Sequence, residues 1–285
     1  MMTTQPTHPK TLNAAPVDRK LNALFCFLLV VVFISAANVQ QQWHVILGLL
    51  LATAFSFLAF LIQRLTLDGM FAAIVIGIFV LGFGGWPTVG VLLIFFISSV
   101  ALSNTKSKLP ADLPKDIRRD GKQVWANGFW LVVSLILYGI FNSPLFIIAA
   151  LGSIATATAD TWGTEVGTRL SNKTYLVTDF SKVATGSNGG VSIKGTIATV
   201  LGSTLIAAIS IYVFSLQLAV FICIFAAGFL GSVADSYFGA IFQRNNSSVT
   251  LPVLNQTIPF SNNIVNGIST GIGGLLAAIL KLIII

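Results

Sequence analysis

The chain has 285 residues, of which 55% are hydrophobic and only 9% are charged, and its mean hydropathy is +0.89. This composition excludes a water-soluble fold for most of the chain and favours a polytopic membrane protein. The formal net charge of +7 would suit nucleic acid. However, the basic residues are scattered through the segments between apolar runs, so we expect them to set topology and we expect no nucleic-acid partner.

Apolar windows of about twenty residues recur along the chain, whereas ten-residue segments of alternating polarity are absent. The fold class that follows is all-α, a polytopic transmembrane helix bundle of about nine spans. The expected spans cover residues 21–38, 44–62, 69–85, 87–103, 124–141, 144–162, 195–214, 217–236 and 263–283. The third window is the weakest, because Gly82, Gly84 and Gly85 thin it out before Trp86 and Pro87.

The basic residues predict how these spans are oriented. If the N-terminus is cytoplasmic, five segments share its side, and they hold every Lys and Arg except Lys281. These segments are 1–20, 63–68, 104–123, 163–194 and 237–262.

The same pattern predicts the domain organisation. We expect a polar cytoplasmic N-terminal segment over residues 1–20, followed by one transmembrane domain over residues 21–285. The short N-terminus argues against a long plastid transit peptide, so we expect the protein in a plasma or inner membrane. The active-site loops, on the cytoplasmic face, would be 104–123, 163–194 and 237–262.

Three acidic residues stand at predicted cytoplasmic span ends. Asp160 and Glu165 would end the sixth span, and Asp235 would end the eighth. Both spans run in the same direction, so the three carboxylates would meet at one depth. Charged groups at such a place are costly and mark function, although an acid at a helix end can simply reach water. Carboxylate oxygens suit Mg²⁺, which is held by one or two carboxylates plus substrate phosphates.

The two acidic sites have similar surroundings. Residues 160–162 and 235–237 both read acid, hydroxyl, aromatic, which suggests an internal duplication about an axis along the membrane normal. The hydroxyl residues, Thr161 and Ser236, join the acids as candidate nucleotide ligands.

A glycine-rich segment precedes the predicted span 195–214. Glycines let the backbone approach a ligand closely, and successive N–H groups at a helix start bind anions. The Walker pattern is absent, so a plain turn is the alternative. The candidate nucleotide- and phosphate-binding residues here are Lys182, Gly186, Ser187, Asn188, Gly189, Gly190 and Lys194.

The segment 104–123 is rich in basic residues. A solvated loop that fixes orientation and meets anionic head groups explains most of its charge. Polar residues also enter the spans that start at 124 and 263, where amides usually serve helix packing. The candidate ligands of a second, acceptor phosphate are Arg118, Arg119, Lys122, Gln123, Asn127, Asn262 and Asn266.

Taken together, these residues give the chain a resemblance to an integral membrane family first known as domain of unknown function ninety-two, whose described member is the phytyl-phosphate kinase of tocopherol synthesis. The resemblance covers residues 68–282. Its motifs are Gln123-Val124-Trp125-Ala126-Asn127-Gly128, Asp160-Thr161-Trp162-Gly163-Thr164-Glu165-Val166-Gly167, Gly186-Ser187-Asn188-Gly189-Gly190-Val191-Ser192, Gly228-Phe229-Leu230-Gly231-Ser232-Val233-Ala234-Asp235-Ser236 and Asn262-Asn263-Ile264-Val265-Asn266. The departures from the usual pattern, at Gly163, Ala184, Ser187 and Ser261, remove no carboxylate and bear on substrate preference.

The resemblance implies that a phosphoryl group passes from a nucleoside triphosphate, CTP by analogy with related lipid kinases, to a phytyl or polyprenyl monophosphate. It implies Asp160, Glu165 and Asp235 as catalytic, metal-binding residues and Mg²⁺ as cofactor. The isoprenoid tail would lie between helices in the bilayer. Two other hypotheses stay open. One is an ion-coupled small-molecule transporter, and the other is a cytidylyltransferase-like enzyme that acts on a lipid phosphate and releases pyrophosphate.

Overall fold

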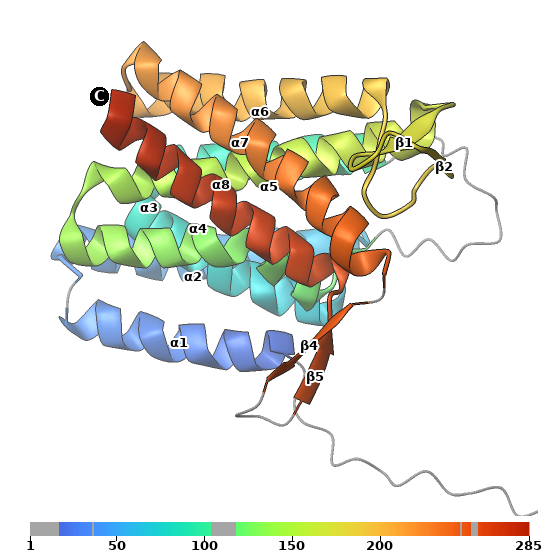
Figure 1. Ribbon diagram of the computed structural model, residues 1–285. Coiled ribbons are helices and arrows are strands. Elements are labelled where there is room, and N and C mark those ends of the chain that lie inside the picture. Colours follow the sequence, from blue (N-terminus) through green and yellow to red (C-terminus); the bar gives the residue numbers. More distant parts are fainter. Residues whose placement is uncertain (1–16, 36, 104–117, 246, 252–255, 285) are drawn as a thin grey trace, which may run out of the picture.

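The computed structural model describes residues 17–35, 37–103, 118–245, 247–251 and 256–284. These ranges form a helix bundle with small sheets at one end (Figure 1). The helices are α1 (Val17–Ser35), α2 (Val39–Leu61), α3 (Leu67–Ser103), α4 (Gly121–Phe141), α5 (Pro144–Leu170), α6 (Ile193–Phe214), α7 (Leu218–Phe238) and α8 (Asn262–Ile284). Within the described ranges, seven helices are long and apolar enough to cross a membrane. The predicted fold class is therefore confirmed.

Helix α3 contains two of the predicted spans. Its 37 residues would measure about 55 Å if straight, whereas the apolar core of a bilayer is about 30 Å thick. Gly85 interrupts the helix with φ 67° and ψ −174°, beside Pro87. The helix is thus two arms joined at this glycine, and they correspond to the windows 69–85 and 87–103.

Both ends of α3 lie at the same end of the bundle. Just before the first arm, the N–H of Thr66 donates to the carbonyl of Arg119 (3.1 Å). At the close of the second arm, Ser103 Oγ donates to the carboxylate of Glu165 (2.8 Å), which neighbours the Arg119 guanidinium. We call this the site end and the opposite one the far end. Figure 1 shows the strands at the site end and the C-terminus at the far end.

The chain folds into two small sheets that the sequence did not predict. The strands are β1 (Thr174–Leu176), β2 (Lys182–Val183), β3 (Gly190–Val191), β4 (Ser248–Leu251) and β5 (Gln256–Pro259). The first sheet has the order β2-β1-β3, with Tyr175 opposite Lys182 on one side and Val191 on the other. Strands β4 and β5 pair antiparallel. Strands this short leave no periodic pattern in a sequence.

Helix α5 continues past the predicted end of its span, to Leu170. Asp160 and Glu165 therefore lie inside the helix and not at its end, which corrects the sequence-based boundary. The prediction ended the span where hydrophobicity falls, but the helix continues through polar residues. Thr168 Oγ1, for example, donates to the carbonyl of Thr164 one turn earlier (2.7 Å).

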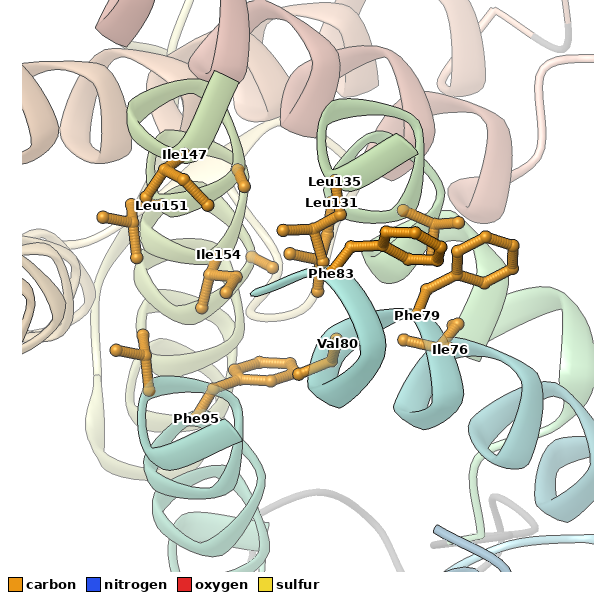
Figure 2. Packing of buried hydrophobic residues seen from close by; sticks show 14 of the residues in the cluster. Ile76, Phe79, Val80, Phe83, Phe95, Leu131, Leu135, Ile147, Leu151 and Ile154 are labelled. Atoms are coloured by element: carbon orange, nitrogen blue, oxygen red, sulfur yellow. The ribbon is translucent and has the colours of Figure 1, made fainter. Parts of the chain in front are cut away.

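Helix α5 is also the central helix, in contact with α3, α4, α6, α7 and α8. Leu151 and Ile154 are fully buried, and Figure 2 shows them with Ile147 on the face that meets the core. Small residues bring α7 close. A Cβ added to Gly228 would lie 2.8 Å from that of Ala155. This close packing fixes the position of Asp160, five residues farther along α5.

Candidate functional site

A polar cavity of about 190 Å³ lies at the site end, between α5, α6, α7 and the segment that joins β2 to β3. Glycines and hydroxyl residues make up most of its wall, together with two acids. The lining residues include the predicted site residues Asp160, Gly186, Ser187, Asn188, Gly189, Gly190, Asp235, Ser236 and Asn262. The structure therefore unites two of the three predicted carboxylates with the predicted glycine segment.

Asp160 of α5 and Asp235 of α7 meet in this cavity. The helices are held together nearby by Thr156, whose Oγ1 donates to the carbonyl of Ala227 (3.2 Å). The two carboxyl groups lie within hydrogen-bonding reach of each other. Carboxylates at such a distance repel each other unless a proton or a cation lies between them. The predicted convergence of these two acids is confirmed.

Helix α8 supports Asp235 from a third direction. Ser269 Oγ donates to Asp235 Oδ2 (2.8 Å). The side-chain amide of Asn266, in the orientation that suits both of its polar atoms, donates to the same oxygen (3.1 Å) and to the carbonyl of Asn262 (2.9 Å). The sequence groups Asn262 and Asn266 with the basic loop as candidate acceptor ligands. The structure places them beside Asp235 instead, because the start of α8 packs on α7.

The glycine segment, residues 186–190, consists of tight turns. The N–H of Ser187 donates to the carbonyl of Ala184 (3.1 Å), and the N–H of Gly190 donates to the carbonyl of Ser187 (2.9 Å). Every residue of the segment lines the cavity, as predicted. Its backbone therefore faces any molecule bound there.

Two glycines of this segment have left-handed backbone conformations. The φ angles are 88° at Gly186 and 74° at Gly189, which glycine adopts without steric cost. At Gly189 a Cβ would also lie 2.4 Å from that of Ala240. The segment is thus packed against the π-helical turn η1 (Gly239–Gln243), which continues α7.

Helix α6 begins at the same cavity. Ser192 Oγ accepts from the N–H of Gly195 (3.2 Å) and from the hydroxyl of Ser171 (2.7 Å). Thr196 and Thr199 add hydroxyl groups to the wall. The free N–H groups and dipole at a helix start favour an anion. The glycine segment and the start of α6 together suit phosphate oxygens.

Three residues predicted to bind phosphate lie outside the cavity. Lys194 Nζ donates to the carbonyl of Leu170 (3.1 Å), Lys182 is exposed on β2, and Thr161 does not line the wall. Both lysines flank the glycine segment in sequence, but the strand and the helix that carry them direct them elsewhere. The described lining residues include no Lys or Arg, so the cavity wall is acidic.

Glu165 has a different set of neighbours. Its carboxylate pairs with Arg169 (2.7 Å) and accepts from Ser103 Oγ (2.8 Å). Five residues along an α-helix correspond to a rotation of about 140° from Asp160, which takes Glu165 off the cavity wall. The structure therefore does not bring Glu165 together with the other two predicted carboxylates. Within the described ranges, no three His, Cys, Asp or Glu side chains group as a metal site.

The residues predicted for the acceptor phosphate have several roles. Gln123 forms a capping box with Asp120, whose Oδ1 accepts from the Gln123 N–H (2.8 Å). Arg118 and Lys122 are exposed. The guanidinium of Arg119 instead lies over the ring of Phe95, 5.3 Å from its centre.

Arg119 and Asn127 line a second cavity, which is larger and apolar. It measures about 500 Å³ and lies between α2, both arms of α3, α4 and α5. Burial lowers the pKa of Arg119, and the nearby carboxylate of Glu165 raises it. A guanidinium keeps its charge in proteins, so this cavity has a permanent cation in its wall.

Sequence reasoning missed several residues of the polar cavity. Thr196 and Thr199 of α6 are three residues apart, and Thr164 and Thr168 of α5 are four residues apart. This spacing places each pair on one face of its helix, a signal that could have found them. Gln243 had no such signal, because it belongs to η1, where the helical spacing changes. It lines the cavity, and its amide nitrogen is buried without a hydrogen-bond partner in the part of the chain that the structure describes.

Comparison with known proteins gives the chain a family. The sequence profile of the integral membrane protein family DUF92 matches residues 50–274. The uncharacterized membrane protein MJ0933 of Methanocaldococcus jannaschii is 33% identical over 214 residues, which cover 75% of this chain and 84% of that protein.

Two plant proteins are also similar. Protein VTE6, chloroplastic, of Arabidopsis thaliana is 28% identical over 146 residues, 50% of this chain and 40% of that protein. Protein PGR of the same plant is 25% identical over 235 residues, 72% of this chain and 81% of that protein. No solved structure matches the chain. The matched range 50–274 contains the whole polar cavity, and the chain belongs to the integral membrane protein family DUF92.

Proposed function

We propose that this protein is a membrane-embedded kinase that transfers the terminal phosphoryl group of a nucleoside triphosphate, CTP by our expectation, to an isoprenoid monophosphate. The observation that carries the proposal is the pairing of Asp160 with Asp235 opposite a glycine segment and a helix start in one cavity. The five motifs shared with the phytyl-phosphate kinase family support the choice of acceptor.

The cavity has an anion-binding side and an acidic side. Phosphate groups would be favoured at the N–H groups of residues 186–190 and at the start of α6. The carboxylates of Asp160 and Asp235 would repel those phosphates unless a cation joined them. Two carboxylates plus phosphate oxygens fit Mg²⁺, so we infer that this pair holds it. Bound there, Mg²⁺ would neutralise charge on the transferring phosphoryl group.

Other residues of the chain position the reactants. Ser269 and Asn266 hold Asp235 in place through its Oδ2. Gln243 lines the cavity, and its buried amide nitrogen, which has no partner among the described residues, would donate to a phosphate oxygen if the side chain turned toward it. The acceptor is a monophosphate, already ionised at neutral pH, so its oxygen attacks without a general base. One phosphorus–oxygen bond forms, the bond to the leaving nucleoside diphosphate breaks, and the product is the isoprenoid diphosphate.

The test is a transfer assay with the purified protein in detergent. Mg²⁺ and CTP labelled in its terminal phosphate are added, with phytyl, farnesyl or geranylgeranyl monophosphate as acceptor. We expect label in an organic-soluble diphosphate and CDP as the second product. Release of pyrophosphate would indicate a cytidylyltransferase-like enzyme. Absence of transfer from any nucleoside triphosphate, in protein shown to be folded, would overturn the proposal.

A cation-coupled transporter is the second candidate function, because two acids face each other in a cavity whose described lining residues include no Lys or Arg. Asp160 is about 15 Å along α5 from its end at Leu170, and its cavity is acidic. Proteoliposomes separate the two functions. Cation-driven uptake of a solute without nucleotide consumption would favour the transporter, whereas label transfer that stops when both acids are substituted favours the kinase.

A further inference from the structure

The apolar cavity is not explained by phosphoryl transfer. Its volume of about 500 Å³ falls within the roughly 300–1,000 Å³ typical of small-molecule sites. Its wall is almost entirely hydrocarbon, contributed by α2, α3, α4 and α5. Figure 2 shows Phe95 of the second arm of α3 directed toward Val80 of the first arm, and both line the cavity.

The cavity extends between the two ends of the bundle. Arg119 lines it at the site end, and Trp86 lines it at the far end, beside the break at Gly85. The first arm of α3, which runs between these points, is about 27 Å long by helix geometry. The cavity therefore spans close to the whole apolar thickness of a bilayer, about 30 Å.

The cavity is also narrow, since about 500 Å³ along the roughly 27 Å of the first arm of α3 corresponds to a mean cross-section of about 20 Å². A Cβ added to Gly77, in its wall, would lie 2.6 Å from that of Ala52 on α2. One added to Gly128 of α4 would lie 2.4 Å from Ile76 Cδ1. The backbones of three helices thus approach closely around it. Such a slot suits one hydrocarbon chain better than the two chains of a phospholipid.

Two polar side chains face the site end of this slot. Within the described ranges, neither the guanidinium of Arg119 nor the side-chain amide of Asn127 makes a hydrogen bond or an ion pair, and Arg119 contacts the ring of Phe95. A guanidinium offers five N–H donors in a geometry that matches phosphate. A charged group of this kind in an apolar wall is stabilised when an anion pairs with it.

We propose that the apolar cavity binds a single long hydrocarbon chain with a phosphate head group. Arg119 and Asn127 hold the head, and the chain extends toward Trp86. The inference rests on the proposed function only where it identifies this ligand as the acceptor monophosphate. The cavity itself defines the ligand class, an anionic single-chain amphiphile.

The head group would lie next to the polar cavity. Ala157 lines the apolar cavity, and Asp160, three residues later on α5, lines the polar one. Three residues separate them by about 4.5 Å along the helix axis. Beside Asn127, the carbonyl of Ala126 accepts from Thr270 Oγ1 of α8 (3.1 Å). The chain site and the nucleotide site are therefore on neighbouring faces of the same turn of α5.

Binding measured without nucleotide tests the proposal. Purified full-length protein in detergent is titrated with radiolabelled farnesyl or geranylgeranyl monophosphate. Two variants fill the slot at different depths: Ala73→Phe near the site end and Val89→Phe near Trp86. Ala208→Phe, on an exposed face of α6 outside the cavity, is the matched control. Arg119→Gln removes the charge at the head group.

The expected pattern depends on chain length. Ala73→Phe weakens binding of both ligands about tenfold or more, the usual scale of overpacking. Val89→Phe weakens binding of the longer geranylgeranyl ligand and spares the shorter one. Arg119→Gln weakens binding of geranylgeranyl monophosphate and leaves geranylgeraniol unaffected. Ala208→Phe binds as the unmodified protein does.

Several results would overturn the proposal. One is unchanged binding in both slot variants, with thermal unfolding like that of Ala208→Phe. Another is equal competition by phosphatidylglycerol, which would assign the slot to ordinary lipid. If Ala73→Phe fails to fold, the smaller Ala73→Leu gives the same readout.

The outcomes also separate this inference from the proposed kinase. The expected binding pattern without phosphoryl transfer keeps the chain site and removes the kinase. Transfer to geranylgeranyl monophosphate that all slot variants retain keeps the kinase and removes the chain site.

Discussion

The polar and apolar cavities share a wall, helix α5, yet their construction is opposite. The polar cavity is small and holds two acids, hydroxyl groups and glycines whose backbones approach one another closely. The apolar cavity is larger, and Arg119 and Asn127 are among its few polar lining residues. In the first, individual atoms determine what can bind. In the second, only shape and one charge do.

This difference predicts how each cavity responds to substitution. Removal of one charge or donor from the polar cavity should weaken transfer or nucleotide binding about tenfold or more with little change in fold, because each group acts on a specific atom of the metal–nucleotide complex. The apolar cavity should tolerate exchange among hydrocarbon side chains and respond to a change in its volume or in the charge of Arg119. The following substitutions test this comparison.

Loss of either cavity acid should have the largest effect. Asp160→Asn and Asp235→Asn keep side-chain size but remove the charge that we assign to Mg²⁺ and the triphosphate. We expect transfer to fall about a hundredfold or more, with thermal unfolding in detergent close to that of the unmodified protein. Asp179→Asn is the control, since Asp179 is an exposed acid outside the cavity. Full transfer by either cavity variant would refute its assigned role.

The glycine segment offers a matched pair of substitutions. Gly186→Ala and Gly189→Ala both force alanine to a positive φ, at about 1–2 kcal/mol. Only at Gly189 does the new Cβ overlap another residue, Ala240; at Gly186 the nearest atom is 4.0 Å away. Gly189→Ala should therefore raise the KM for nucleotide about tenfold, and Gly186→Ala much less. Equal effects on KM would show that backbone strain, not the packing of the segment, controls binding.

The polar cavity was largely predictable from sequence, for a physical reason. Asp160, Asp235 and residues 186–190 are costly in an apolar chain, and their direction along parallel spans fixed their common depth. Facing was harder. The prediction misplaced Glu165, because it treated residues five apart on a helix as neighbours on one face, although they differ by a rotation of about 140°.

The apolar cavity could not be predicted in the same way. The residues that line it, such as Ala73, Leu92 and Phe96, are of the same types as those that face lipid, so hydropathy does not distinguish them. Its shape depends on the break at Gly85, which folds the two arms of α3 side by side around it. The sequence indicated a weak span at that point, but it carried no sign of a cavity there.

Substitution of Gln243 tests whether the polar cavity is preorganised to bind nucleotide. The buried amide nitrogen of Gln243 has no partner within the described residues, which costs about 1–3 kcal/mol in the absence of ligand. Gln243→Met keeps the length of the side chain and removes the donor. We expect equal or greater thermal stability together with nucleotide binding about tenfold weaker, measured by titration. Lower stability with unchanged binding would show that the amide serves the fold alone.

Glu165→Gln should have the smallest effect on transfer. It tests whether a residue that is close to Asp160 in sequence, but outside the polar cavity, takes part in transfer. Glu165 lies in the same motif as Asp160, but its carboxylate contacts Arg169 and Ser103 at the junction of α5 with α3. Loss of its charge should lower the free energy of unfolding by about 1 kcal/mol, as for a partly exposed ion pair. At saturating nucleotide, the fall in the rate of transfer should be about a hundredfold smaller than the fall caused by Asp160→Asn.

Because Glu165 also neighbours Arg119, the KM for the isoprenoid monophosphate should shift in Glu165→Gln, whereas the KM for nucleotide should not. A shift in the KM for nucleotide instead would mean that Glu165 turns toward the polar cavity when substrate binds.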